Sequence, residues 1–159
     1  MATDTHIKFA GVDGEATHKD HKGEIEVLSW HWEVTNASSS ESGGGSGKGK
    51  AVPGEFTFTH MYDKASTVLA KHCASGKHFD TVKMTSRKSG EGQKEFLTVT
   101  LKEVKITKVS PSGSQSGDIS ESVSFSYKDV DFGYKPQDDK GGLGGEVKFG
   151  WDVASTSTR

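Results

Sequence analysis

The residues best suited to bind a ligand or support a reaction are a glycine-rich loop, seven histidines and a single cysteine. From Gly44 to Gly49-Lys50 the loop has the spacing of a phosphate-binding loop, but Ala51 stands where such a loop needs a hydroxyl to hold magnesium. The loop leads to Pro53 and a strand-like segment, so no helix N-terminus follows to receive a phosphate. The sequence therefore argues against nucleotide binding.

The histidines do not follow the spacing of a structural metal site. His18 and His21 are close together in the charged stretch HKDHKGE, where weak surface binding of a metal is conceivable. A structural zinc site needs about four fixed ligands, and no second pair at a suitable spacing follows. His72 falls on the apolar side of an expected helix, which is typical of a packed histidine. We therefore expect no cofactor and no metal.

The sequence also lacks the motifs that are typical of a catalytic site. Cys73 is expected on a buried helical face, where a thiol behaves as a small hydrophobic group, and no G-x-S-x-G turn occurs. Residues 131–133 spell the kinase tripeptide DFG without a kinase catalytic loop. The carboxylates are scattered singly among Lys, Ser and Thr, which is typical of the solvated face of a strand. A glycosidase needs a pair of carboxylates in space, and the sequence alone does not exclude such a pair. We expect no enzyme activity.

Composition and charge narrow the class of protein further. The 159 residues suit a single domain, residues 1–159, and a chain with 20 glycines and 31% hydrophobic residues fits short strands joined by turns. The net charge of −2 argues against nucleic-acid binding and against a polybasic membrane anchor. The N-terminus lacks the basic and apolar regions of a signal peptide, and no apolar stretch reaches the roughly 20 residues that a membrane span needs. We expect the chain to be synthesised in the cytoplasm. We expect no insertion into a membrane.

Apolar residues recur at every second position in many short segments, which indicates half-buried strands. The segments are, in chain order, Ile7/Phe9, Ile25/Val27, Leu28/Trp30/Trp32/Val34, Phe56/Phe58, Val82/Met84, Leu97/Val99/Leu101, Val104/Ile106, Ile119/Val123/Phe125/Tyr127, Val130/Phe132/Tyr134 and Val147/Phe149/Trp151/Val153.

The alternation changes phase near Leu28, near residues 102–103 and near residues 128–129. A slip of one residue moves every later side chain to the other face, so a strand stays buried only if it bulges or turns a corner there. Ordinary loops would also give such slips, but residues 95–109 contain no Gly or Pro to form one. The pattern favours a mainly β fold, a two-sheet β-barrel, over a flat sheet.

One segment has helical spacing and predicts an α-helix over residues 64–75, packed on the side of the barrel. Asp63 is placed to cap its N-terminus and Gly76 to end it in the left-handed conformation. Three further segments are expected to be loops: a flexible Gly/Ser-rich loop over residues 36–50, a turn-rich connection over 110–118 and a mobile loop over 135–145.

Several of these segments, in order and with similar spacing, resemble the haemolysin-coregulated protein (Hcp) family, the tube protein of type VI secretion systems. The resemblance covers nearly the whole chain, and the ordered set is more specific than any one piece. The segments are HKGEIEVLSWHW (21–32), FTFT (56–59) followed by DKAS (63–66), SGKHF (75–79), FLTVTLKEV (96–104), YKPQ (134–137) and VKFGW (147–151).

The resemblance implies a structural component of the secretion system of a Gram-negative bacterium. It implies homohexameric rings that stack into the inner tube of a contractile apparatus, inside sheath proteins and behind a spike tip protein, with small effector proteins carried in the lumen. Such a protein assembles in the bacterial cytoplasm and is then secreted. The alternatives are a monomeric secreted β-barrel that acts as a binding module, and an enzyme built on a β scaffold.

The alternation and the resemblance together suggest roles for individual residues. Burial of one strand face favours a core that contains Trp30, Trp32, Phe125, Phe149 and Trp151. Ser29, His31 and Glu33 would then point to the opposite face and are candidates to line the lumen. Within the 36–50 loop, Ser42, Gly45, Lys48 and Lys50 are candidates for contact between stacked rings, because a flexible loop can become ordered against a neighbouring copy.

Overall fold

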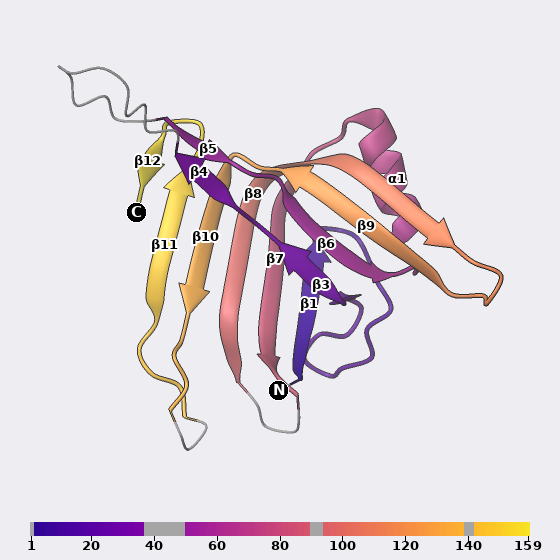
Figure 1. Ribbon diagram of the computed structural model, residues 1–159, viewed down its shortest axis with the longest axis horizontal. Coiled ribbons are helices and arrows are strands. Elements are labelled where there is room, and N and C mark those ends of the chain that lie inside the picture. Colours follow the sequence, from indigo (N-terminus) through magenta and orange to yellow (C-terminus); the bar gives the residue numbers. More distant parts are fainter. Residues whose placement is uncertain (1, 37–49, 90–93, 139–141) are drawn as a thin grey trace.

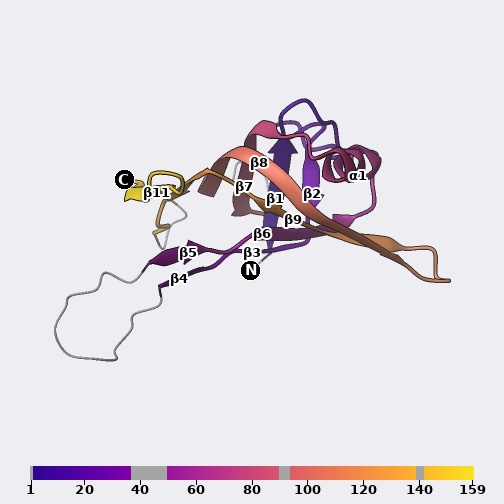
Figure 2. The same cartoon turned by 90° about the horizontal axis from the view of Figure 1, so that it is seen from above.

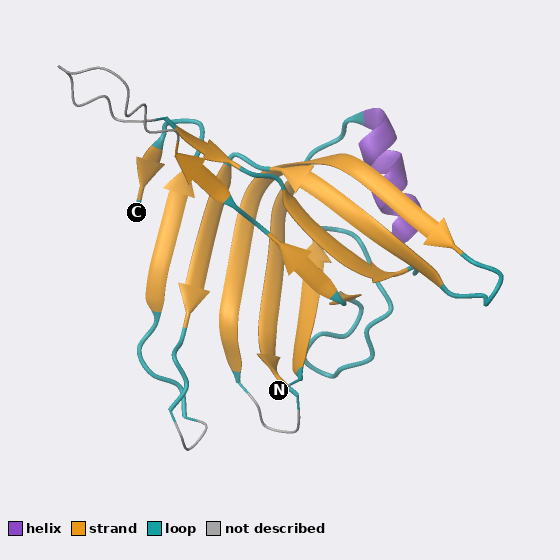
Figure 3. Cartoon of the chain, in the orientation of Figure 1, coloured by secondary structure: helices purple, strands orange, loops and turns teal. Residues whose placement is uncertain are grey.

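The computed structural model describes residues 2–36, 50–89, 94–138 and 142–159, and two sheets dominate it (Figures 1 and 3). All strand pairs are antiparallel, and the first sheet has the order β12-β11-β10-β8-β7-β1-β2. Its strands are β1 (Thr3–Phe9), β2 (Ile25–Val27), β7 (Phe79–Lys88), β8 (Glu95–Gly113), β10 (Asp129–Tyr134), β11 (Val147–Asp152) and β12 (Ser157–Thr158).

The second sheet crosses the first and shares β8 with it (Figures 1 and 2). It consists of β3 (Ser29–His31), β6 (Phe56–Met61), β9 (Ile119–Ser126) and the second half of β8. A separate two-stranded ribbon is formed by β4 (Val34–Asn36) and β5 (Ala51–Pro53). With one helix among the described residues, α1 (Ser66–Ser75), this architecture confirms the predicted mainly β, two-sheet fold with a helix on its side.

Each of the predicted phase slips marks a point where the chain passes from one sheet to the other. At Leu28 the chain leaves β2 and enters β3, and the Leu28 N–H donates to the Thr59 carbonyl at 2.8 Å. At Lys128 it passes from β9 to β10. The slip at 102–103 falls inside β8, whose first part pairs with β7 and β10 while its second part pairs with β9.

The corner within β8 is made by an unusual backbone conformation. Glu103 has φ +53°, in the left-handed region that residues with a side chain seldom adopt. This single residue turns the strand, and Val104 and Ile106 remain buried beyond it. The carbonyl of Lys102 accepts a hydrogen bond from the Lys128 N–H at 3.0 Å. This bond joins the corner within β8 to the corner between β9 and β10.

The core lies between the two sheets and is rich in phenylalanine. Phe125 is fully buried and contacts the rings of Phe9, Phe56 and Phe58, with centroids 5.2–6.4 Å apart. Buried side chains from both sheets complete the cluster, among them Ile7, Ile25, Leu69, Val82, Met84, Val99, Leu101, Val104, Ile106, Val123 and Val130.

Of the five predicted core residues, one is placed differently. Trp151 is buried like Phe125, and Trp32 and Phe149 are half-buried and pack against the core. Trp30 is 37% exposed, so its assignment to the core is wrong. It stacks on Phe56 with centroids 5.8 Å apart, but among the described strands β3 pairs only with β6, so it lies at an edge of the second sheet and leaves Trp30 partly exposed.

The helix begins at Ser66, two residues later than predicted. The predicted Asp63 cap is wrong, because Ala65 is the N-cap and no side chain caps the helix. The Asp63 side chain instead accepts a hydrogen bond from the Ala65 N–H at 2.9 Å, within the turn before the helix. Leu69 is buried against the barrel, and His72 stacks on the Phe79 ring at 4.3 Å. Gly76 has φ +72° and its N–H caps the His72 carbonyl, as the sequence predicts.

The predicted connection over residues 110–118 is partly wrong. Residues 110–113 continue β8 and pair with β9, so the turn is confined to 114–118. The Ser and Pro residues within 110–113 are exposed because they belong to a long β8–β9 hairpin. This hairpin projects beyond the core, as seen from above in Figure 2. In the 135–145 segment, Gln137 and Leu143 form an isolated bridge.

Candidate assembly surfaces

The outward face of the second sheet is lined with hydroxyl groups. Alternation along β3, β6 and β9 directs Phe and Val side chains into the core and Ser and Thr side chains outward. The hydroxyls form cross-strand pairs, Ser29 with Thr59 at 2.6 Å and Thr57 with Ser124 at 2.9 Å. The result is a polar, hydroxyl-bearing outward surface on these strands.

The predicted lumen residues extend this polar face. Ser29 belongs to it directly, and His31 and Glu33 are both exposed, with His31 Nε2 lying 3.5 Å from Glu33 Oε2. An exposed ion pair of this kind contributes little to stability, so both groups remain free to meet a partner. Of the predicted stacking residues, Ser42, Gly45 and Lys48 lie outside the described residues; Lys50 is described and exposed.

A cluster of histidines lies on the outer face of the first sheet, where the 10–24 loop folds over β1 and β7. His21 contacts two carboxylates: its Nδ1 lies 2.8 Å from Glu24 and its Nε2 lies 2.9 Å from Glu95. Both ring nitrogens of His21 therefore lie within hydrogen-bond distance of a carboxylate. His6 of β1 stacks on His21 with ring centroids 4.6 Å apart.

His6 is held in its neutral form by its surroundings. Burial lowers the pKa of His6, and the neighbouring His21 lowers it further against the opposing pull of Glu24 and Glu26. The His6 Nδ1 atom is buried and has no hydrogen-bond partner among the described residues. Protonation of His6 would therefore place a charge beside His21 in a desolvated position.

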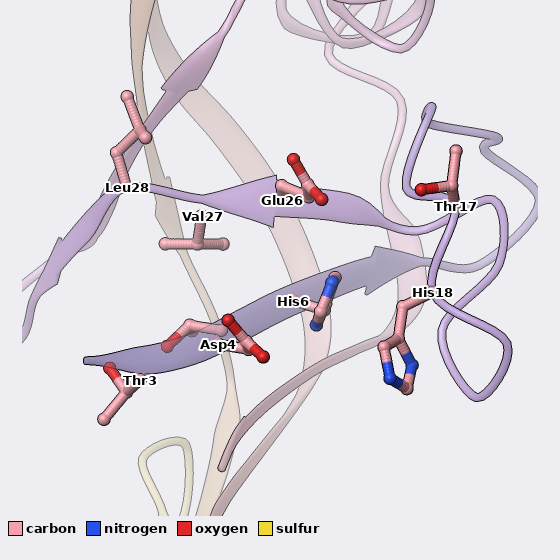
Figure 4. Close-up of a pocket in the computed structure, with 9 residues that line it drawn as sticks. Thr3, Asp4, His6, Thr17, His18, Glu26, Val27 and Leu28 are labelled. Atoms are coloured by element: carbon pink, nitrogen blue, oxygen red, sulfur yellow. The ribbon is translucent and has the colours of Figure 1, made fainter. Parts of the chain in front are cut away.

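Arg87 of β7 joins the 10–24 loop to the sheet. It is buried, its guanidinium lies against the His18 ring, and a guanidinium nitrogen lies 3.6 Å from the Asp20 carboxylate. Beside it, a pocket of about 340 Å³ opens between β1, β2 and the loop, lined by Asp4, His6, His18 and Glu26 among others (Figure 4). Imidazole and carboxylate groups face this space together.

This cluster does not match a metal centre. Within the residues that the structure describes, no group of three or more His, Cys, Asp or Glu side chains is placed to hold an ion. The His18 and His21 stretch, the possible weak metal site, instead anchors the 10–24 loop. A second buried pair, His60 Nε2 and Glu121 at 2.7 Å, joins β6 to β9 inside the barrel, where no ligand can reach it.

An apolar pocket of about 570 Å³ lies between the β4–β5 ribbon and β11. Val34 and Ala51 of the ribbon line one side, Phe149 and Trp151 line the other, and Lys50 stands at its edge. The ribbon is tied to the barrel by a relay: the Trp32 indole N–H donates to the Tyr127 hydroxyl, which donates to the Gly54 carbonyl at 2.8 Å.

Sequence reasoning missed the histidine cluster and the ribbon pocket. His6, Arg87 and Glu95 are far apart in the sequence, and each taken alone resembles an ordinary polar residue on a strand face. A weak signal existed in the pairing of the charged HKDHKGE stretch with a histidine on the polar phase of the first strand. The pocket between the β4–β5 ribbon and β11 could not be predicted from the sequence, because the alternation of apolar residues does not show which segment covers β11.

The amino-acid sequence matches a known protein family and a curated relative. The profile of the family described as "Type VI secretion system effector, Hcp" matches residues 6–134. A curated protein, "Protein hcp1" of Pseudomonas aeruginosa, is 43% identical over 156 residues, which cover 96% of each chain. Family and relative agree across almost the entire length of the described fold.

Solved structures agree with the sequence comparisons. A structure described as that of a type six secretion system protein matches with a TM-score of 0.92 at 31% identity, covering 99% of this chain and all of the other. Hcp1 from Salmonella typhimurium matches with a TM-score of 0.80 at 34% identity, covering both chains fully.

The fold is thus that of a type VI secretion system protein. The chain belongs to the Hcp family of type VI secretion systems, as its sequence motifs predict. No helix among the described residues is long and apolar enough to span a bilayer.

Proposed function

We propose that this protein forms homohexameric rings that stack into the inner tube of a type VI secretion apparatus. The observation that carries the proposal is the 43% identity to the Hcp1 protein of Pseudomonas aeruginosa over 96% of the chain. Closed rings need a head-to-tail interface, in which one surface of each copy meets a different surface of the next. Exposed apolar side chains occur on the β4–β5 ribbon and β11, and separately at Leu28 and at Met61 and Tyr62, which supports two different contact surfaces on one copy.

The hydroxyl-lined face of the second sheet is our candidate for the lumen wall. Ser29, His31 and Glu33 would then line the channel and meet small effector proteins. A polar wall with shallow relief supports this role, because cargo must be held weakly enough to leave. Replacing His31 with Ser should change which effectors are retained without changing the rings, and co-purification of effectors with each variant tests this.

The 36–50 loop is our candidate for contact between stacked rings, through Ser42, Gly45, Lys48 and Lys50. The ribbon formed by β4 and β5 flanks this loop on both sides. Deleting residues 40–49 should leave single rings intact, since shortening a loop changes its closure entropy little. Tubes should be lost; normal stacking after the deletion would refute the assignment.

The tube would assemble in the bacterial cytoplasm within sheath proteins, carry a spike protein at its tip and leave the cell with it. The test of the whole proposal is the mass of the purified protein by light scattering, together with negative-stain imaging. Annular particles with a hexameric mass are expected. A monomer at all concentrations would contradict the proposal and favour a secreted binding module.

A further inference from the structure

The 10–24 loop is attached to the rest of the chain in two different ways. Its base is held by the buried apolar side chains of Val12 and Ala16, and the Ala16 N–H donates to the Glu24 carbonyl at 2.9 Å. Its tip, which we define as residues 17–22, is exposed except for His18 and His21, whose rings lie against the first sheet. The attachment of the tip therefore depends on histidines, whereas that of the base does not.

Three imidazole rings gather where the tip meets the sheet. The ring centroids of His6 and His21 are 4.6 Å apart, those of His18 and His21 are 5.9 Å apart, and those of His6 and His18 are 6.2 Å apart. The buried guanidinium of Arg87 lies against the His18 ring. A proton gained by any of these rings adds a charge to a group that already contains the charge of Arg87.

The hydrogen bonds of His18 require a ring without a charge. The Asp20 N–H donates to Nδ1 at 3.2 Å, and a guanidinium nitrogen of Arg87, which can only donate, lies against Nε2. A neutral imidazole has one bare nitrogen and accepts one of these bonds, whereas a protonated imidazole has none. Protonated His18 would turn two N–H groups toward these donors and place its charge beside the guanidinium.

His6 is also placed to remain uncharged. Its side chain is 4% exposed, and its Nδ1 atom has no hydrogen-bond partner within the described part of the chain. Burial and the neighbouring His21 lower the pKa of His6. Figure 4 shows His6 on β1 and His18 on the loop, beside the pocket of about 340 Å³ that both residues line.

His21 opposes the release of the tip, but only weakly. A protonated His21 ring can donate to both Glu24 and Glu95, so acid leaves these two contacts in place. The Glu95 side chain is 38% exposed, and an ion pair so open to solvent contributes little to stability. The charges on His6 and His18 arise in a less solvated place, so their effect is the larger one.

Charged groups from every neighbouring element surround the three rings. They are Asp4 and Lys8 of β1, Glu26 of β2, Lys83 and Arg87 of β7, Glu95 of β8, and Asp13, Lys19, Asp20, Lys22 and Glu24 of the loop. Asp4 accepts a hydrogen bond from the Ser89 hydroxyl at 3.0 Å. Glu26 is opposite His6 in the strand register and attracts a charge on it, but Glu26 is exposed, so solvent screens this attraction.

We propose that the loop tip is an acid-sensitive latch: it is closed on the sheet at neutral pH, and protonation of His6 and His18 releases residues 17–22 while the base of the loop stays in place. The closed state is favoured above about pH 6.5, the ordinary pKa of histidine, and is lost as the pH falls below it. Release also opens the pocket between β1, β2 and the loop, because Thr17 and His18 line it. The latch lies within one copy of the chain and does not depend on the proposed ring.

Hydrogen exchange of the whole chain, measured by mass spectrometry, tests the latch. The protein is labelled at about pH 7.5 and about pH 5.5, on either side of the histidine pKa, for times scaled to the intrinsic exchange rate at each pH. In the closed tip the Asp20 N–H is bonded to the His18 ring and the His21 N–H to the His18 carbonyl. Exchange at these amides should be about tenfold faster at the lower pH, because each unit by which closure lowers a pKa changes the opening equilibrium tenfold. Exchange in β7 should not change.

The decisive variant carries His6→Gln and His18→Gln, which keep both side chains neutral at either pH. A glutamine oxygen at position 18 can still accept a hydrogen bond from Arg87, so exchange in the tip should be the same at both pH values. The single variant His18→Gln alters a half-buried loop residue only and should show part of this loss. The matched control is His78→Gln, at an exposed position just before β7, which should keep the full response to acid. Thermal melting confirms that each variant is folded.

Each unfavourable outcome identifies what is wrong. Equal protection of the wild-type tip at both pH values would overturn the latch. A full response to acid in the double variant would overturn it as well, because other groups would then release the tip. Loss of protection in β7 together with the tip would show general unfolding by acid in place of a local release, and would also refute the proposal.

Discussion

Replacing Glu103 with Gly should stabilise the protein, although it removes a side chain from the middle of a strand. Glu103 has φ +53° where β8 turns from one sheet into the other. A left-handed backbone costs a residue with a side chain about 1–2 kcal/mol, and glycine adopts it freely. Glycine in turn loses more conformational entropy on folding, which costs about 0.5–1 kcal/mol relative to alanine. The net expected gain is therefore about 0.5–1 kcal/mol.

The measurement is urea or thermal unfolding of the variant beside the wild type, at one concentration low enough that assembly does not contribute. A gain of that size raises the melting temperature of a chain of 159 residues by about 1–4 °C. The matched control is Lys102→Gly, one residue earlier on the same strand, exposed and without a positive φ. It should lose about 0.5–1 kcal/mol.

The difference between the two glycine variants is the critical quantity. If Glu103→Gly destabilises the protein as much as Lys102→Gly does, the backbone at the corner carries no strain. The explanation of how β8 joins both sheets would then be refuted.

Other substitutions should behave as follows. Phe125→Ala should cost about 3–5 kcal/mol in urea unfolding, because it opens a cavity in the aromatic centre of the core. Burial lowers the pKa of His6 below the unfolded value of 6.5, so the free energy of unfolding should fall as the pH drops below about 6.5. The total loss is about 1.4 kcal/mol for each unit by which folding lowers the pKa, and the His6→Gln variant should show a smaller loss. An unchanged pH profile would remove His6 from this role. Tyr127→Phe should cost about 1–3 kcal/mol, since it leaves the Trp32 N–H and the Gly54 carbonyl without their shared partner; equal melting curves would contradict this.

The strands and corners of this fold could be predicted because they depend on local alternation. Each slip in the pattern, near Leu28, at 102–103 and at 128–129, coincides with a passage between sheets, since a buried strand face must be restored after the chain turns. The helix could be predicted for the same reason, because the apolar spacing and the terminal Gly76 act within a few residues of one another; the predicted Asp63 cap failed because the helix begins two residues later, after Ala65.

The placement of particular side chains depended on which strand has a neighbour. Trp30 has the alternation of a core residue, but its strand is at an edge of the second sheet, so the residue is partly exposed. Residues 110–113 contain Ser, Pro and Gly and resemble a turn, yet pairing with β9 makes them a strand. In both cases, the decisive interaction comes from a segment distant in the sequence.

The sequence by itself therefore determined the family, the mainly β architecture, the helix and the corners, because these follow from ordered motifs and from short-range patterns of apolar residues. Only the tertiary structure decided the surfaces. It brought His6 against His21 and Arg87 against His18, and it placed Lys50 beside an apolar pocket between the β4–β5 ribbon and β11. Such groupings depend on how strands far apart in the chain pack, which local periodicity does not encode.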